Sequence, residues 1–168
     1  MTIADRITAP GQKKILALDG GGIRGMLTVE VLAAIESLLG RELKRGPEFV
    51  LADYFDFVAG TSTGAIIAAC VSLGMKVDAI RNFYVASGQK MFDKASILKR
   101  FRYKYEDEKL SDEMKTVFGE ETTLGTDRLR TVLMMVMRNA STDSPWPISN
   151  NPFAKYNLPG RRDAPHSD

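Results

Sequence analysis

The sequence of 168 residues contains one cysteine, Cys70, and one histidine, His166. A single cysteine cannot form a disulfide within the chain, so a reducing compartment is expected. No apolar run has the length needed to span a bilayer. Residues 1–12 are polar and contain no apolar segment of the kind that marks a secretory signal. These features favour a soluble protein of the cytoplasm.

A strong excess of one charge is also missing. The 23 basic and 21 acidic residues leave a net charge of +2, which gives no bulk electrostatic argument for nucleic acid as a partner. Hydrophobic residues make up 44% of the chain. A chain of this size is within the range of a single domain with a real core. We therefore expect one globular domain.

Apolar patterning predicts strands alternating with helices. The predicted strands are 15–18, 55–59 and 131–137, and the predicted helices are 27–41, 65–71, 77–92 and 107–118. In the first helix, the apolar residues at helical spacing are predicted to form the buried face; they are Leu27, Val31, Ala34, Ile35 and Leu38. Strand–helix alternation is typical of an α/β fold with a mainly parallel sheet flanked by helices.

Neither end of the chain carries a pattern that could build a core. Residues 1–12 are expected to be a flexible lead-in, 13–157 the folded domain, and 158–168 a flexible tail. From Ala140 onward the chain is rich in proline, asparagine and serine, and no further strand is predicted there.

The pentapeptide Gly60-Thr61-Ser62-Thr63-Gly64 lies between a predicted strand and a predicted helix. A G-x-S-x-G motif in this context is typical of a nucleophile elbow, a tight turn that presents the serine hydroxyl at a helix N-terminus. The helix end adds unpaired N–H groups and a positive dipole, which favour a developing oxyanion. The alternative is a serine that only caps a helix. Ser62 is therefore a candidate nucleophile.

A glycine-rich stretch, Gly20-Gly21-Gly22-Ile23-Arg24-Gly25, follows the first predicted strand. It formally satisfies the G-x-G-x-x-G pattern of dinucleotide sites, but that interpretation also needs an acid at the end of a second strand. The region about twenty residues on, 42–47, is not strand-like. The stretch could instead supply backbone N–H donors to an oxyanion hole. A turn with no ligand is the third interpretation. Arg24 would add positive charge or anchor the loop.

The two motifs together, in this order and about forty residues apart, resemble the patatin-like phospholipase family. The resemblance extends from about Lys13 to about Tyr156 and includes the runs 55–59 and 150–156. It implies a three-layer α/β sandwich and a lipid acyl hydrolase with a Ser–Asp dyad and neither metal nor cofactor, acting on phospholipids or related esters. It also implies roles for nine residues. Ser62 is the nucleophile, the oxyanion hole is lined by Gly20, Gly21, Gly22 and Arg24, and the motifs are shaped by Asp19, Gly25, Gly60 and Gly64.

One departure from the family pattern concerns the second catalytic residue. The family carries it as an aspartate in a later Asp-Gly-Gly or Asp-Gly-Ala motif, whereas the only Asp-Gly here is Asp19-Gly20. We expect that the chain stops partway through the domain and that it is weak or inactive by itself. The alternative function is a non-catalytic relative that binds lipid, nucleotide or a partner chain.

Other polar residues are weaker candidates for the base. His166 lies in the expected tail, and Asp53 and Asp56 precede the elbow, where structural roles are expected. The basic and aromatic segment 94–105 has two open interpretations: peripheral contact with anionic lipid headgroups, or a solvated helix or loop. Cys70, on an apolar helix, is expected to be inert.

Overall fold

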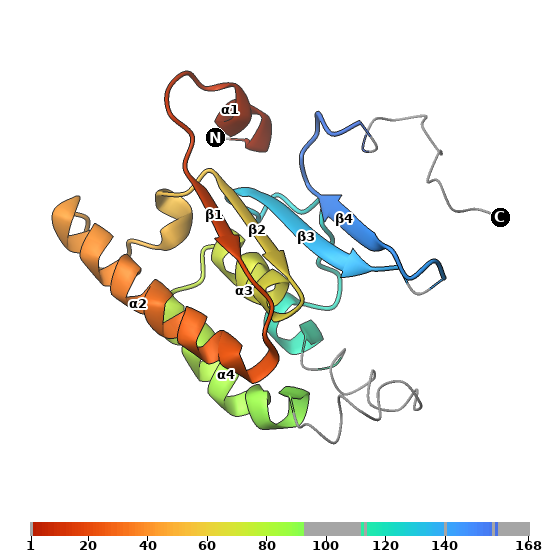
Figure 1. Cartoon of the computed structure of the whole chain (residues 1–168). Helices are drawn as coiled ribbons and strands as arrows, with labels where there is room; N and C mark the ends of the chain where they lie inside the picture. Colours follow the sequence, from red (N-terminus) through yellow and green to blue (C-terminus); the bar gives the residue numbers. More distant parts are fainter. Residues whose placement is uncertain (1, 93–111, 113, 140, 156, 158–168) are drawn as a thin grey trace.

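The computed structural model describes residues 2–92, 112, 114–139, 141–155 and 157 (Figure 1). They form a four-stranded sheet in the order β1-β2-β3-β4. The strands are β1 (Ile15–Leu18), β2 (Phe57–Thr61), β3 (Val132–Arg138) and β4 (Pro145–Ser149). The first three are parallel, with Leu16 opposite Val58 and Val58 opposite Leu133. This confirms a mainly parallel α/β sheet with these three strands as neighbours.

Helix α1 (Ile3–Thr8) precedes the sheet, and helices and short 3-10 turns follow β1 and β2. The elements after β1 and β2 are η1 (Gly22–Arg24), α2 (Gly25–Glu42), η2 (Leu51–Asp53), α3 (Thr63–Ser72) and α4 (Val77–Phe92). The bounds of α4 are those predicted from the sequence. Residues 112 and 114–118 are also helical and end at Gly119, as predicted for the second half of 107–118.

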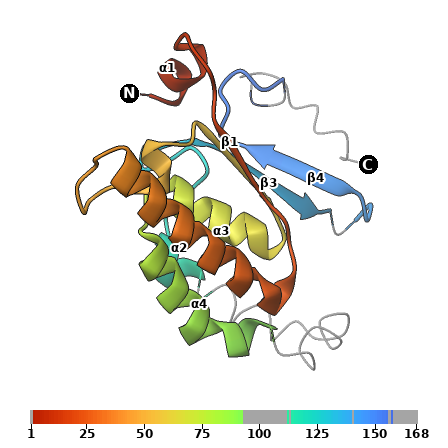
Figure 2. The same cartoon turned by 60° about the vertical axis from the view of Figure 1, so that its left-hand side comes forward.

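The larger helices lie on one face of the sheet. The strand order advances in the same direction from β1 to β2 and from β2 to β3, so right-handed connections put both sets of helices on the same side. Figures 1 and 2 show α2, α3 and α4 on that side, with α3 against the strands and α2 beside α4. The described residues thus supply two of the three expected layers.

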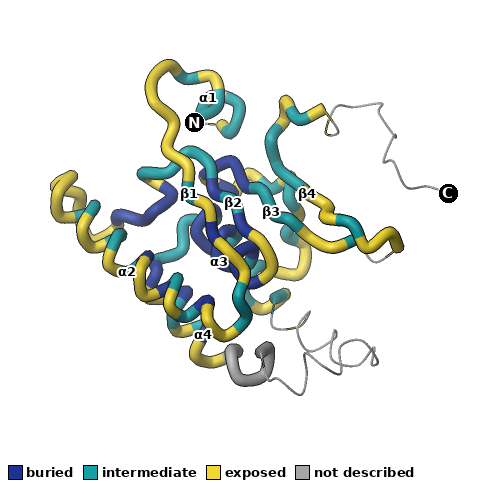
Figure 3. Tube along the Cα trace, in the orientation of Figure 1, coloured by how far each residue is buried: buried dark blue, intermediate teal, exposed yellow. Residues whose placement is uncertain are grey.

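The core lies between α3 and the sheet. Fully buried side chains come from β2 and β3 (Val58, Leu133), from α3 (Ile67, Cys70) and from the outer helices (Leu32, Ile80). Figure 3 shows the buried stretches gathered in β2, β3 and α3. This packing fixes the carboxyl ends of β1, β2 and β3 side by side at one edge of the sheet.

The predicted buried face of α2 is wrong for most of its residues. Leu27, Val31 and Leu38 are 69%, 58% and 47% exposed, whereas Val29 and Leu32 are buried. The cause is that α2 is apolar around most of its circumference, so helical spacing selects no single face. Packing against α3 and α4 decides which face is buried.

Helix α1 was not predicted, and it is attached to the amino end of β2. Thr2 and Asp5 form a capping box at its start. The Arg6 guanidinium donates to the Phe55 carbonyl at 3.1 Å and to Asp56 Oδ1 at 3.3 Å. Asp56 also accepts the Lys14 N–H at 2.9 Å. Asp56 therefore has the structural partners expected of it, at the edge of the sheet opposite Ser62.

Strand β4 was also not predicted from the sequence. It pairs antiparallel with β3 and contains two prolines, Pro145 and Pro147. Proline cannot donate to a strand ladder, so it argues against a central strand but is tolerated at an edge. The position of β4 at the end of the sheet order satisfies that condition.

Several predictions fall outside the described residues. These are the segment 94–105, the tail 158–168 with His166, and most of the first half of the helix predicted at 107–118. Within the described part of the chain, every helix is too short or too polar to cross a bilayer.

Cys70 is fully buried in α3, and burial raises the pKa of its thiol to about 12. We expect the native chain to react very slowly with a thiol reagent such as dithionitrobenzoate at pH 8, because the thiolate is the reactive form. One thiol per chain should react after denaturation. The raised pKa also predicts that stability is lost as pH rises from the ordinary thiol value, about 8.5, toward 12, because only the unfolded chain ionises there. Rapid stoichiometric labelling of the folded chain would contradict the expected slow reaction of the Cys70 thiol.

Candidate active site

Ser62 lies in the turn between β2 and α3 with φ 51° and ψ −124°. A positive φ is uncommon for a residue with a side chain and marks local strain that the surrounding structure must maintain. The Ser62 carbonyl accepts the Ala65 N–H at 2.9 Å, which closes the turn onto α3. The side chain is exposed at the helix N-terminus. The backbone thus has the geometry predicted for a nucleophile elbow.

Close backbone approach explains both glycines of the elbow. A Cβ on Gly60 would lie 2.2 Å from the Gly64 carbonyl oxygen. A Cβ on Gly64 would lie 2.4 Å from the Leu18 carbonyl oxygen and 2.6 Å from that of Asp19. The start of α3 therefore rests directly on the end of β1, where the glycine-rich loop begins.

The glycine-rich loop lies against the elbow. A Cβ on Gly20 would meet Ser62 Cβ at 2.8 Å and the Thr61 carbonyl oxygen at 2.9 Å. The Gly20 N–H donates to Thr61 Oγ1 at 3.0 Å, and the Gly21 N–H donates to Thr63 Oγ1 at 3.1 Å. The two threonines that flank Ser62 thus hold the loop. The two motifs meet at the carboxyl edge of the sheet, as predicted.

These hydrogen bonds divide the loop amides into two groups. The amides of Gly20 and Gly21 are engaged by threonine hydroxyls. Among the described residues, the Gly22 N–H has no hydrogen-bond partner, and Gly22 has φ 58°. A helix leaves its first amides unpaired within the helix, and at the start of α3 the Ala65 N–H is bonded to the Ser62 carbonyl, which leaves the amides of Thr63 and Gly64 next to Ser62.

Tyr84 of α4 contacts the glycine-rich loop, a role that was not predicted from the sequence. Its hydroxyl donates to the Gly22 carbonyl at 3.2 Å. Burial raises the pKa of Tyr84, and a hydrogen bond with Thr63 acts in the opposite direction. A Cβ on Gly25 would lie 2.1 Å from the Tyr84 hydroxyl, which explains why glycine is needed there. The sequence did contain a signal for this contact, because a tyrosine on a buried helix face usually needs a hydrogen-bond partner.

Asp19 and Arg24 occupy the two ends of the loop. Asp19 follows β1 and is exposed, and its carbonyl packs against Gly64. Arg24 ends η1 and is also exposed, with its backbone N–H donating to the Gly21 carbonyl at 3.2 Å. The Arg24 side chain therefore lies on the surface beside the loop.

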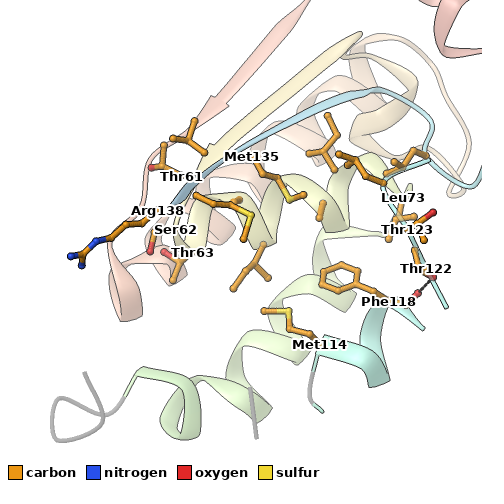
Figure 4. Close-up of a pocket in the computed structure, with 18 of the residues that line it drawn as sticks. Thr61, Ser62, Thr63, Leu73, Met114, Phe118, Thr122, Thr123, Met135 and Arg138 are labelled. Carbon is orange, nitrogen blue, oxygen red and sulfur yellow. Dashed lines mark hydrogen bonds between the residues drawn. The ribbon is translucent and has the colours of Figure 1, made fainter. Parts of the chain in front are cut away.

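A cavity of about 890 Å³ begins at Ser62. In Figure 4, Thr61, Ser62, Thr63 and Arg138 lie at one end, with Leu73, Thr122 and Thr123 at the other. Its remaining lining is mostly apolar, from α3, β3 and the helical residues 114–118. Met135 and Met137 of β3 are among these residues, and Met137 is 51% exposed rather than part of the core.

Among the described residues, no side chain hydrogen-bonds the Ser62 hydroxyl, and no three His, Cys, Asp or Glu residues cluster as a metal site would require. Asp53 accepts the Val50 N–H at 3.2 Å and pairs with Arg130, which is the cap role expected of it. Asp143 lines the cavity, but it pairs with Arg138.

The chain matches a family model described as patatin-like phospholipase over residues 16–161. "Patatin-like protein 1" of Oryza sativa subsp. indica is 36% identical over 132 residues, covering 70% of this chain and 31% of that protein. "cUMP-AMP-activated phospholipase" of Escherichia coli is 39% identical over 109 residues, covering 65% and 30%. "cGAMP-activated phospholipase" of Vibrio cholerae is 31% identical over 146 residues, covering 80% and 40%. The chain thus spans between 30% and 40% of the length of these relatives.

Proposed function

Because the chain belongs to the patatin-like phospholipase family, we propose that it carries the nucleophile and the oxyanion hole of a serine lipid acyl hydrolase. The observation that carries the proposal is the strained Ser62 turn, pressed against the glycine-rich loop at the opening of an apolar cavity. A dinucleotide site is disfavoured, because Gly20 packs against Thr61 and Ser62 of the elbow and the Gly20 and Gly21 amides are bonded to threonine hydroxyls.

In this proposal, Ser62 Oγ attacks the carbonyl carbon of an acyl ester. The carbonyl oxygen becomes an oxyanion, and the alcohol part of the lipid leaves with a proton. The acyl group remains on Ser62 until water releases it as a fatty acid. The Ser62 proton passes to a carboxylate, the part played in the family by the aspartate of the Asp-Gly-Gly or Asp-Gly-Ala motif. This chain has no such motif beyond Asp19-Gly20.

The oxyanion is proposed to accept hydrogen bonds from the Gly22 N–H and from the first amides of α3. Gly20 and Gly21 belong to the same site but act by fixing the loop, since their amides bond to Thr61 and Thr63. Arg24, exposed beside the loop, would contribute positive charge. Such donors help most when they are fixed in advance, and removal of one typically slows turnover about 100- to 1000-fold.

A fluorophosphonate probe tests the nucleophile directly, because it is attacked by an activated serine and stays bound to it. Because the chain is expected to be weak by itself, we expect slow labelling that reaches one label per chain, located on Ser62 by peptide mass spectrometry, and no label in Ser62→Ala. Ser37→Ala, which changes an exposed serine of α2, is the matched control and should label normally. Equal labelling of Ser62→Ala would assign the reaction to another residue.

The same experiment distinguishes the hydrolase from the second candidate function, that of a non-catalytic relative that binds lipid. The absence of a hydrogen-bonded base at Ser62 among the described residues favours that candidate. A folded chain that binds lipid yet gives no label at Ser62 would support it over the hydrolase.

A further inference from the structure

The cavity that begins at Ser62 is a long groove along one side of α3. Ala65, Ile66 and Ala69 form its helical wall, and Leu73 lies at the far end. Ala65 and Leu73 are eight residues apart, which corresponds to roughly 12 Å along a helix. For comparison, one leaflet of a bilayer has a hydrocarbon thickness of about 15 Å, half of the usual 30 Å core. The groove therefore has the length scale of a lipid acyl chain.

The opposite walls are apolar as well. They are formed by Leu133 and Met135 of β3 and by Met114, Phe118 and Leu124. Figure 4 shows Met135 on one side and Met114 and Phe118 on the other. The Thr122 hydroxyl at the far end donates to the Phe118 carbonyl, so it is already hydrogen-bonded within the chain.

Charge is confined to two of the lining residues, Arg138 and Asp143, which pair with each other. Arg138 lies at the Ser62 end in Figure 4. Three further threonines, Thr122, Thr123 and Thr126, also line the groove, and the walls between its two ends are apolar. A groove that is polar at the nucleophile and apolar along its middle matches a ligand with a polar carbonyl head and an unbranched hydrocarbon tail. A polar or charged ligand would lose its hydration there without gaining partners.

We propose that this groove holds the acyl chain of the substrate and that Ala69 sets the length of chain it accepts; this rests on the proposed function. Ala65 and Ala69 are four residues apart and so lie on the same face of α3. Their single methyl groups leave the groove open. A larger side chain at Ala69, roughly two thirds of the way from Ser62 to Leu73 along α3, would divide the groove and leave only the part near Ser62.

Binding of free fatty acids tests the groove without requiring turnover. The Ser62→Ala chain is titrated with octanoic, dodecanoic and hexadecanoic acid below their micelle concentrations, by displacement of a fluorescent fatty acid. Affinity should rise roughly three- to fourfold per added methylene until the groove is filled. In Ser62→Ala with Ala69→Phe, the affinity for the longer acids should fall at least tenfold, with little change for octanoic acid.

Ala79→Phe is the matched control, since it adds the same side chain to an exposed position of α4. It should leave all three affinities unchanged. If Ala69→Phe does not fold, as judged by circular dichroism and thermal unfolding, the smaller changes Ala69→Val and Ala69→Leu should give a graded loss of long-chain binding. A folded Ala69 variant that binds hexadecanoic acid as well as its parent overturns the proposal.

The two proposals fail in different ways. Chain-length selection that depends on Ala69, in a chain whose Ser62 takes no label, supports the groove and rejects the hydrolase. Labelling of Ser62 without any effect of Ala69 on binding supports the hydrolase and rejects this groove as its acyl site.

Discussion

Gly64→Ala should abolish fluorophosphonate labelling of Ser62 and lower the free energy of unfolding by about 2–4 kcal/mol. The new Cβ would lie 2.4 Å from the Leu18 carbonyl oxygen and 2.6 Å from that of Asp19. Both obstacles are backbone atoms of β1 and its loop, which cannot rotate away as a side chain could. The start of α3 must therefore move off the end of β1, and Ser62 must move away from the glycine-rich loop.

Gly46→Ala is the control for this experiment. No atom lies within 4 Å of a Cβ built on Gly46. Its unfolding free energy should stay within about 0.5 kcal/mol of the parent, and labelling should be normal. Chemical denaturation followed by circular dichroism gives the first quantity, and the rate of probe incorporation gives the second. A Gly64→Ala chain that is as stable and as reactive as Gly46→Ala would show that the elbow does not depend on this contact.

Much of the sheet could be predicted from the sequence, because its strands are encoded locally. The runs around Leu16, Val58 and Leu133 are short, apolar and separated by helical segments, which is sufficient to indicate adjacent parallel strands. Strand β4 could not be found in this way. Pro145 and Pro147 are compatible with a strand only at a sheet edge, and edge position is a property of the whole topology.

The buried face of α2 shows a second limit of local patterns. Apolar residues occur both at Leu27 and Val31, which are exposed, and at Val29 and Leu32, which are buried. Periodicity predicts a face only when the opposite face is polar. In α2 the choice depends on contacts with α3 and α4, which lie far along the chain.

In the candidate site too, the features encoded by local motifs could be predicted and those set by packing could not. Motif spacing was sufficient to find Ser62 and the glycine-rich loop and to predict that they meet. It could not assign the individual amides, because the bonds from Gly20 and Gly21 to Thr61 and Thr63 depend on how two turns about forty residues apart fit together. Tyr84 lies outside both motifs, and its link to Gly22 follows only from the packing of α4.

Thr63→Val should slow labelling of Ser62 about 100-fold while leaving the fold intact. The Thr63 hydroxyl accepts the Gly21 N–H at 3.1 Å and also hydrogen-bonds Tyr84, which in turn holds the Gly22 carbonyl. Valine has nearly the same shape, so packing is kept while the polar link between elbow and loop is lost. A displacement of about 1 Å in a positioned catalytic group can cost about 100-fold in rate.

The conservative variant Thr63→Ser keeps the hydroxyl and should restore most of the labelling rate, which a purely steric role of Thr63 would not predict. The decisive measurement is the maximal rate of inactivation at saturating probe, separated from the probe concentration that gives half of it. Loss of the link should lower the maximal rate and leave the half-saturating concentration nearly unchanged. Thr63 lines the Ser62 end of the groove, but valine keeps its shape there and the apolar walls beyond it are unaltered. If Thr63→Ser is as slow as Thr63→Val, or if only the half-saturating concentration changes, the hydroxyl does not position the loop. The Gly21 amide, which donates to the Thr63 hydroxyl, would then become a candidate oxyanion donor, whereas the Gly20 amide would stay bonded to Thr61.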